Sequence, residues 1–148
     1  MDYVEYLAEL LETNWNANNT DGITPNIIPI YKLKVMDWNI ALKRDLITIY
    51  QVSRTETPTG IGYPAISAED TLTVDIRTTY KDTVDAGRQH ANKLLNEVKR
   101  IIYADRKDYN GLNADYMKIT TIRDLSDRTI RLWRFVIDIS VVKFVEAL

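Results

Sequence analysis

The chain has 148 residues, of which 45% are hydrophobic and 27% are charged, and it contains no cysteine. This size and balance predict one globular domain, residues 1–148, whose core needs neither disulfides nor a metal ion. The lack of cysteine excludes a disulfide scaffold, a thiol nucleophile and a zinc site with thiolate ligands, and it is typical of an intracellular protein.

The net charge of −2 is unevenly distributed along the chain. Residues 1–28 carry acidic side chains and no Lys or Arg, which leaves the remainder at +3. This split favours the orientation of one subunit against another and is far from the charge of a nucleic-acid-binding domain. The start lacks the basic region of a signal peptide, and no stretch reaches the ~20 apolar residues of a membrane helix. We therefore expect a cytosolic protein without membrane contact.

The first half of the chain predicts one helix and then three strands. Residues 2–15 carry apolar side chains at three- and four-residue steps, which predicts an amphipathic helix. Strands are predicted over 30–35, 46–52 and 71–78, where β-branched and aromatic residues are frequent. In the third strand Leu72, Val74 and Ile76 should face the core, because successive side chains point to opposite sides.

A stretch without periodicity, residues 53–70, separates the second and third predicted strands and contains Pro58, Gly60, Gly62 and Pro64. We predict a loop here, which is long for a compact domain, and loops of this length usually carry function or are disordered. A partner would order it, whereas the alternative is a plain surface loop. The side chains expected to anchor a partner are Arg54, Glu56, Ile61, Tyr63 and Ile66.

The second half predicts a long helix and a closing hairpin. From Thr83 to Ile102 the apolar period is helical, and strands are predicted over 116–122 and 129–145 with a turn at 124–127. The odd positions of the last strand are core residues. Its even positions are half apolar, so something should cover part of that face. At ~3.3 Å per residue this strand would be ~55 Å long, and such a strand usually meets a neighbour.

The predicted fold class is therefore α+β, in the order α-β-β-β-α-β-β. Consecutive strands joined by turns favour an antiparallel sheet, with the long helix packed on one face.

No motif predicts catalysis or a cofactor. Gly60–Ala65 fits the relaxed G-x-G-x-x-A fingerprint, but Pro64 and the strand that follows exclude the helix which that fingerprint must open. The single histidine, His90, has no acidic residue at i±4 and is interpreted as a histidine at the boundary of the core. Paired aspartates stand at helix ends or turns, where capping explains them. We expect no enzyme, no cofactor and no metal site.

Arginines gather around the last hairpin, beside Trp133, as they would on a nucleic-acid surface. Aspartates are interleaved with them, so a mixed ion-pairing surface is favoured over a phosphate-binding one. The arginines are Arg123, Arg128, Arg131 and Arg134, and the aspartates are Asp124, Asp127 and Asp138.

Three stretches, TVDIRTT at 73–79, IRDLSD at 122–127 and LWRFVID at 132–138, carry a family likeness together with the element order. The chain resembles the tail-terminator (tail-completion) proteins of long-tailed phages and related archaeal viruses over almost its whole length. The resemblance implies a non-catalytic virion protein that forms a ring, commonly a hexamer, on the head-proximal end of the tail tube. Such a ring ends tube polymerisation and joins the tail to the head connector.

The resemblance also implies the partners and the location. The partners would be further copies of the chain, the tail tube protein and the head–tail connector protein, with assembly in the host cytoplasm and a final place in the virion. DNA could pass through the ring without specific binding. The alternatives are another head–tail joining or minor tail protein and, more remotely, a small enzyme or a nucleic-acid-binding protein.

A head-to-tail ring brings different patches of one chain together, so opposite charges on those patches are natural contacts. The alternative is that these charges pair within one subunit. The loop over 53–70 would become ordered against the tube or the connector. The side chains expected at the subunit interface are Asp75, Arg77, Arg131, Arg134 and Asp138.

Overall fold

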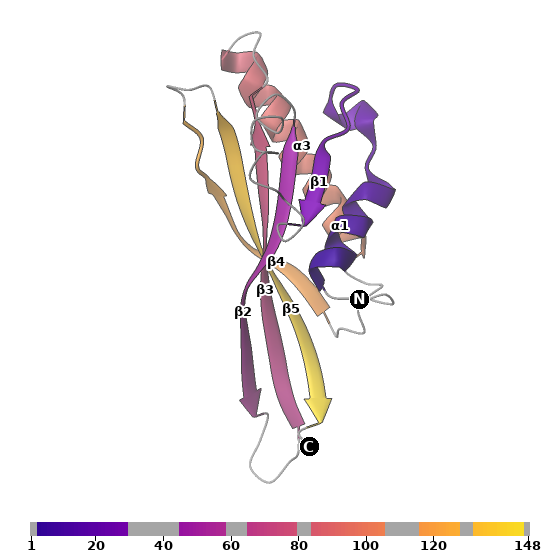
Figure 1. Ribbon diagram of the computed structural model, residues 1–148, viewed down its shortest axis with the longest axis vertical. Coiled ribbons are helices and arrows are strands. Elements are labelled where there is room, and N and C mark those ends of the chain that lie inside the picture. The colour runs from indigo at the N-terminus through magenta and orange to yellow at the C-terminus, as the bar shows by residue number, and fades with distance from the viewer. Residues whose placement is uncertain are drawn as a thin grey trace.

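The computed structural model describes residues 3–29, 45–58, 65–79, 84–105, 116–127 and 132–146, which form an α+β fold. Two helices and a five-stranded sheet make up this part of the chain (Figure 1). The helices are α1 (Tyr3–Asn14) and α3 (Val84–Asp105), with a short 3-10 helix η1 (Ala17–Thr20) after α1. The strands are β1 (Asn26–Pro29), β2 (Leu46–Pro58), β3 (Ala65–Thr78), β4 (Tyr116–Asp124) and β5 (Trp133–Glu146).

The sheet has the strand order β1-β2-β3-β5-β4 and is mixed rather than antiparallel throughout. Strands β2, β3, β5 and β4 alternate in direction, but β1 runs parallel to β2, with Asn26 opposite Leu46. The prediction of an antiparallel sheet was wrong at this edge, because the long connection from β1 to β2 permits a parallel pairing that a tight turn does not. The strand predicted over 30–35 lies outside the described residues.

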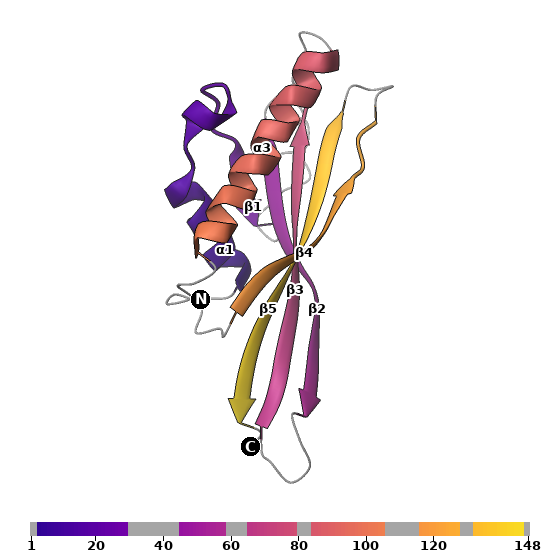
Figure 2. The same ribbon diagram turned by 180° about the vertical axis from the view of Figure 1, so that it is seen from behind.

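Both helices lie on one face of the sheet (Figures 1 and 2). The inward stripe of α3, which includes Leu94, Val98 and Ile102, is buried in one core cluster with the α1 side chains Leu7 and Leu11. As predicted, the sheet contributes alternate residues of β3 and β5 to this cluster. They are Leu72, Val74, Ile76, Trp133, Phe135, Ile137, Ile139 and Val141.

The opposite face of β5 is buried as well, although both helices lie on the other side of the sheet. Val136, Ser140 and Val142 on this face are 1%, 1% and 4% exposed. The expectation that this face is covered is thus confirmed for these three side chains, which are buried by other residues of the same chain.

The predicted loop over 53–70 is instead largely a β-hairpin. Strand β2 continues to Pro58 and β3 begins at Ala65, with Arg54 opposite Asp70 and Thr57 opposite Ser67. The prediction failed because this part of β2 is polar on both faces, and because a register shift between Gln51 and Ser53 interrupts the alternation. Only residues 59–64 of the predicted loop lie outside the described part.

Three strands project beyond the helical layer (Figures 1 and 2). We call this projection the β-arm and define it as residues 53–58 of β2, 65–70 of β3 and 141–146 of β5, which are paired with one another. β5 begins at Trp133 rather than at Thr129, so it is shorter than predicted, and a bridge between Asp127 and Leu132 closes the described part of the β4–β5 hairpin. No helix in the described ranges is long and apolar enough to cross a membrane.

Leu94→Ala tests the packing of α3 against the core. Leu94 is fully buried, so the truncation should lower the free energy of unfolding by about 2–5 kcal/mol. Gln89→Ala on the exposed side of the same helix should change it by less than about 0.5 kcal/mol. Urea denaturation measures both values, and similar small changes in the two variants would contradict the described packing of α3.

Candidate functional site

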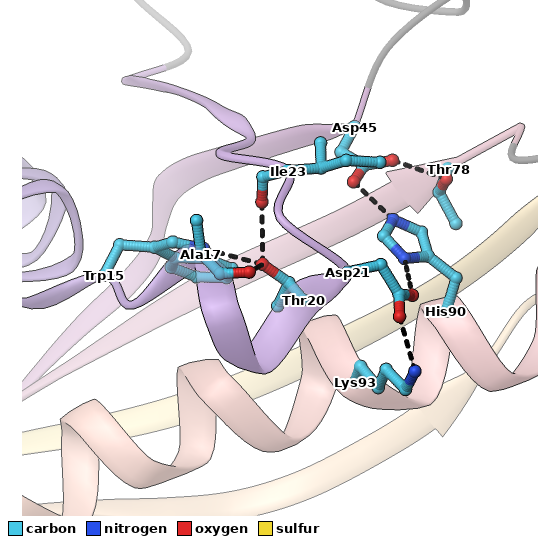
Figure 3. A network of polar contacts seen from close by, with 9 residues as sticks. All are labelled: Trp15, Ala17, Thr20, Asp21, Ile23, Asp45, Thr78, His90 and Lys93. Atoms are coloured by element: carbon cyan, nitrogen blue, oxygen red, sulfur yellow. Dashed lines mark hydrogen bonds and ion pairs between the residues drawn. The ribbon is translucent and has the colours of Figure 1, made fainter.

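His90 is the centre of a polar network that joins three segments distant in sequence (Figure 3). Its Nδ1 lies 2.8 Å from Oδ2 of Asp21, directly after η1, and its Nε2 lies 2.5 Å from Oδ2 of Asp45, directly before β2. Lys93, one turn further along α3, donates to the other oxygen of Asp21 at 2.5 Å. Thr78 at the end of β3 donates to Oδ1 of Asp45 at 2.6 Å.

This network is suited to structure rather than to catalysis. The His90 side chain is 0% exposed, so a substrate has no access to it. The hydroxyl of Thr78 donates to Asp45 and not to the imidazole, so His90 does not activate it as a nucleophile. The two ring nitrogens face different aspartates, and the described residues contain no group of three potential ligands that could hold a metal ion. His90 was expected at the edge of the core, and the structure corrects this to full burial.

Two carboxylates favour the charged imidazolium at this buried position. Burial alone lowers the pKa of His90, but the hydrogen bonds and charges of Asp45 and Asp21 together outweigh it and raise the pKa above the ordinary 6.5. The hydrogen bond from Lys93, with a smaller effect of His90, lowers the pKa of Asp21. The network therefore holds α3, the end of η1 and the start of β2 together by ionic hydrogen bonds.

A second network, around Glu97, attaches η1 to α3. The Glu97 carboxylate accepts hydrogen bonds from the backbone N–H of Asn16 at 2.6 Å, from Asn19 at 3.0 Å and from Arg100 at 2.6 and 2.9 Å. Arg100 also donates to the carbonyl of Asn14 at the end of α1. The hydrogen bond from Arg100 is the main reason that the pKa of Glu97 is lowered from 4.5 to about 2, with further contributions from Asn16 and Asn19.

The predicted interface charges on β3 and β5 lie together on the sheet face away from the helices. Asp75 is 2% exposed and accepts two hydrogen bonds from Arg77, at 3.3 and 3.1 Å, and two from Arg134, at 3.1 and 2.8 Å. Because Arg77 and Arg134 stand opposite each other in the β3–β5 ladder, one carboxylate serves both guanidinium groups. These ion pairs lie within one chain, which agrees with the alternative expectation that the charges pair within one subunit.

Asp138, the next predicted interface residue along β5, also has its partners within the chain. It accepts hydrogen bonds from the hydroxyls of Thr73 at 2.9 Å and Thr121 at 2.6 Å, and Arg123 lies 3.5 Å away. The last predicted interface residue, Arg131, falls outside the described residues. The use of these side chains between subunits stays a prediction.

The β-arm contains the described residues that were expected to anchor a partner. Arg54 and Glu56 are half exposed and ion-paired at 3.2 Å on β2, and Ile66 lies in β3 opposite Pro58. Ile61 and Tyr63 lie in the part of the chain that the structure does not describe. At the base of the arm Asp70 is 2% exposed and accepts a hydrogen bond from Gln51 at 2.7 Å, and burial raises its pKa against the opposing effect of Arg54.

The sequence alone did not reveal the networks at His90 and Glu97. The His90 partners Asp21 and Asp45 are 69 and 45 residues away in sequence, and Asn16 is 81 residues from Glu97. The only local signals were a histidine and a glutamate within a helix whose apolar face is otherwise regular. Neither signal indicates which segment provides the partner.

Comparison with known proteins found no match: no protein-family model and no curated protein corresponds to this chain.

The charge state of His90 should make stability depend on pH. Since its folded-state pKa is raised above 6.5, its stabilisation is fully present below that pH and is lost as the pH rises through the folded-state value. His90→Gln has no such group, so the difference in free energy of unfolding between the two proteins should shrink as the pH rises above 6.5. A urea series across this range measures it, with Gln89→Ala as a control that keeps the wild-type profile. A constant difference would contradict the charged network.

Glu97→Gln should destabilise the protein in the opposite pH range. A pKa lowered from 4.5 to about 2 corresponds to about 3 kcal/mol of stability above pH 4.5, which is lost as the pH falls towards 2. The variant should therefore unfold more easily at neutral pH and lose less stability on acidification. The matched control is Glu12→Gln, on the exposed side of α1. Equal acid sensitivity of Glu97→Gln and wild type in thermal unfolding would rule out the proposed contribution.

Proposed function

We propose that this chain is a structural subunit of a ring at the head-proximal end of a viral tail tube, where it ends the tube and joins the tail to the head connector. The observation that supports this proposal best is the β-arm, which extends a sheet beyond the helices that cover its core. Residues 51–57 of β2 are all exposed, so this part of the strand buries little surface within the chain. A domain without a partner would therefore gain little stability from the extension.

The outer backbone edge of β2 also favours a protein partner. β1 pairs with β2 only from Leu46 to Ile49, and no other strand among the described residues lies beside the rest of β2 on that side. An open edge of this length invites pairing with another chain, and proteins normally keep such edges short or covered. The β-arm is therefore suited to contact an adjoining ring of the tail or the connector.

The polar networks favour a structural role over an enzymatic one. Every buried side-chain nitrogen and oxygen atom of the described residues has a hydrogen-bond partner. The buried histidine and carboxylates are used in joining helices and strands, as at His90, Glu97 and Asp75. Asp75 and Asp138 lie among the arginines of the sheet face and would repel a continuous phosphate backbone, which disfavours a nucleic-acid-binding surface.

Removal of the chain from virus particles tests this function. A virus that lacks it should produce tails longer than wild type, measured by negative-stain electron microscopy, because nothing ends tube polymerisation. Tails of normal length that fail to join heads would instead favour another head–tail joining protein. Normal tails on normal heads would contradict both roles.

A shortened β-arm tests the part of the chain that carries the proposal. In the variant an Asn-Gly turn replaces residues 57–67, so that it joins Glu56 to its ladder partner Ala68. We expect the thermal unfolding midpoint to change little, because the replaced residues lie beyond the helices, while tails become overlong or remain unjoined. Wild-type tail length and joining in this variant would show that the arm is not used.

A further inference from the structure

α1 carries an acidic stripe on one flank of the helix, beside its buried side and next to Pro29 at the end of β1. Glu5, Glu9 and Glu12 recur at i, i+4 and i+7, which places them on one face of the helix. The adjoining side carries Val4, Leu7, Ala8 and Leu11, which are buried. Glu9 and Glu12 are exposed and make no ion pair with another described residue.

The sheet carries an arginine surface, Arg77, Arg123 and Arg134, on the face turned away from the helices. Arg77 and Arg134 share the buried carboxylate of Asp75, which holds both guanidinium groups in place. Their side chains are nevertheless 21% and 29% exposed, and that of Arg123 is 54% exposed. Arg77, Arg123 and Arg134, taken together with Asp75 and Asp138, carry a net charge of +1. Because the guanidinium groups are already ordered, a partner carboxylate binds them at a reduced entropic cost.

The two surfaces cannot meet within one chain, because the sheet lies between them. α1 packs on the sheet face that bears Ile137, whereas Arg134 and Asp138 project from the other face of the same strand. Figures 1 and 2 show both helices on one side of the sheet. A contact that joins the two surfaces is therefore intermolecular and not self-complementary, and contacts of this type generate rings or filaments.

We infer that the acidic stripe of one copy docks on the arginine surface of the next copy, and that repetition of this contact builds the ring. The inference rests on the proposed function and names the side chains of its subunit contact. The chemistry on both sides is complementary, with carboxylates on a rigid helix facing preordered guanidinium groups. The contact should consequently weaken as salt is added.

Charge reversal of each surface tests this contact. One variant, Glu9→Lys with Glu12→Lys, makes both surfaces basic, and a second, Arg123→Glu with Lys118→Glu, makes both acidic. Lys118 lies on the same sheet face, opposite Ser140. Each variant alone should raise the dissociation constant of self-association at least about tenfold in sedimentation velocity, because like charges then meet. An equal mixture should associate again, since each stripe then finds an opposite surface on the other variant.

A matched control separates the contact from total charge. Glu56→Lys with Asp85→Lys makes the same charge change at two exposed sites outside both surfaces, on β2 and at the start of α3, and should leave self-association unchanged. Circular dichroism shows whether each variant is folded. The inference is overturned if the stripe variant associates like wild type, or if the mixture of two folded variants fails to associate. An effect of the surface variant alone would place the arginines against a different part of the neighbouring copy, which also overturns the inference.

Cross-linking extends the test to assembled tails, since the wild-type chain has no cysteine. A variant with Glu9→Cys and Arg123→Cys, treated with a short bis-maleimide, should give a ladder of covalent multimers, whereas Glu9→Cys alone should give no species above a dimer. A ring on the tail that yields no ladder overturns the contact and leaves the proposed function intact. A chain that is monomeric in solution and absent from tails overturns both.

Discussion

The pairing of β3 with β5 determines the arrangement of the remaining elements. Each of the 14 residues of β3 is paired with one of β5, from Ala65 opposite Glu146 to Thr78 opposite Trp133, without a bulge. The ladders on either side both contain a register shift, between Gln51 and Ser53 and between Ile119 and Thr121. The β3–β5 pair is therefore the uninterrupted ladder against which the helices pack at one end, and the β-arm is its continuation at the other.

Strict alternation along this pair gives the sheet two chemically different faces. Val74 and Ile137 are opposite each other on the helix side and fully buried, whereas Asp75 lies one residue further on and points away from the helices. A carboxylate buried to this extent is costly unless it is paired, and the two arginines that pair with it remain partly exposed. The alternation of side chains that closes the core thus also leaves ordered arginines on the sheet face away from the helices. On the helix side, α1 presents carboxylates.

The sequence predicted those elements whose apolar side chains follow a regular period over the core. This holds for α1, for α3 and for the halves of β3 and β5 that contain Val74 and Ile137. It failed where strands leave the core, because from Ser53 to Thr57 no side chain must be apolar and hydrophobic periodicity carries no signal. The parallel pairing of β1 and the burial of His90 depend on contacts between distant segments. No local pattern around Asn26 or His90 indicates those contacts.

We propose that this chain forms a ring by repeating one contact, between the acidic stripe of one copy and the arginine surface of the next. A cryo-electron microscopy reconstruction of tails at the junction with the head tests it most directly. We expect a closed ring of this chain in which α1 of each copy lies against the arginine-bearing sheet face of its neighbour, with the β-arms directed at the tube or the connector. A junction without this chain, or a ring in which α1 faces solvent in every copy, would contradict it.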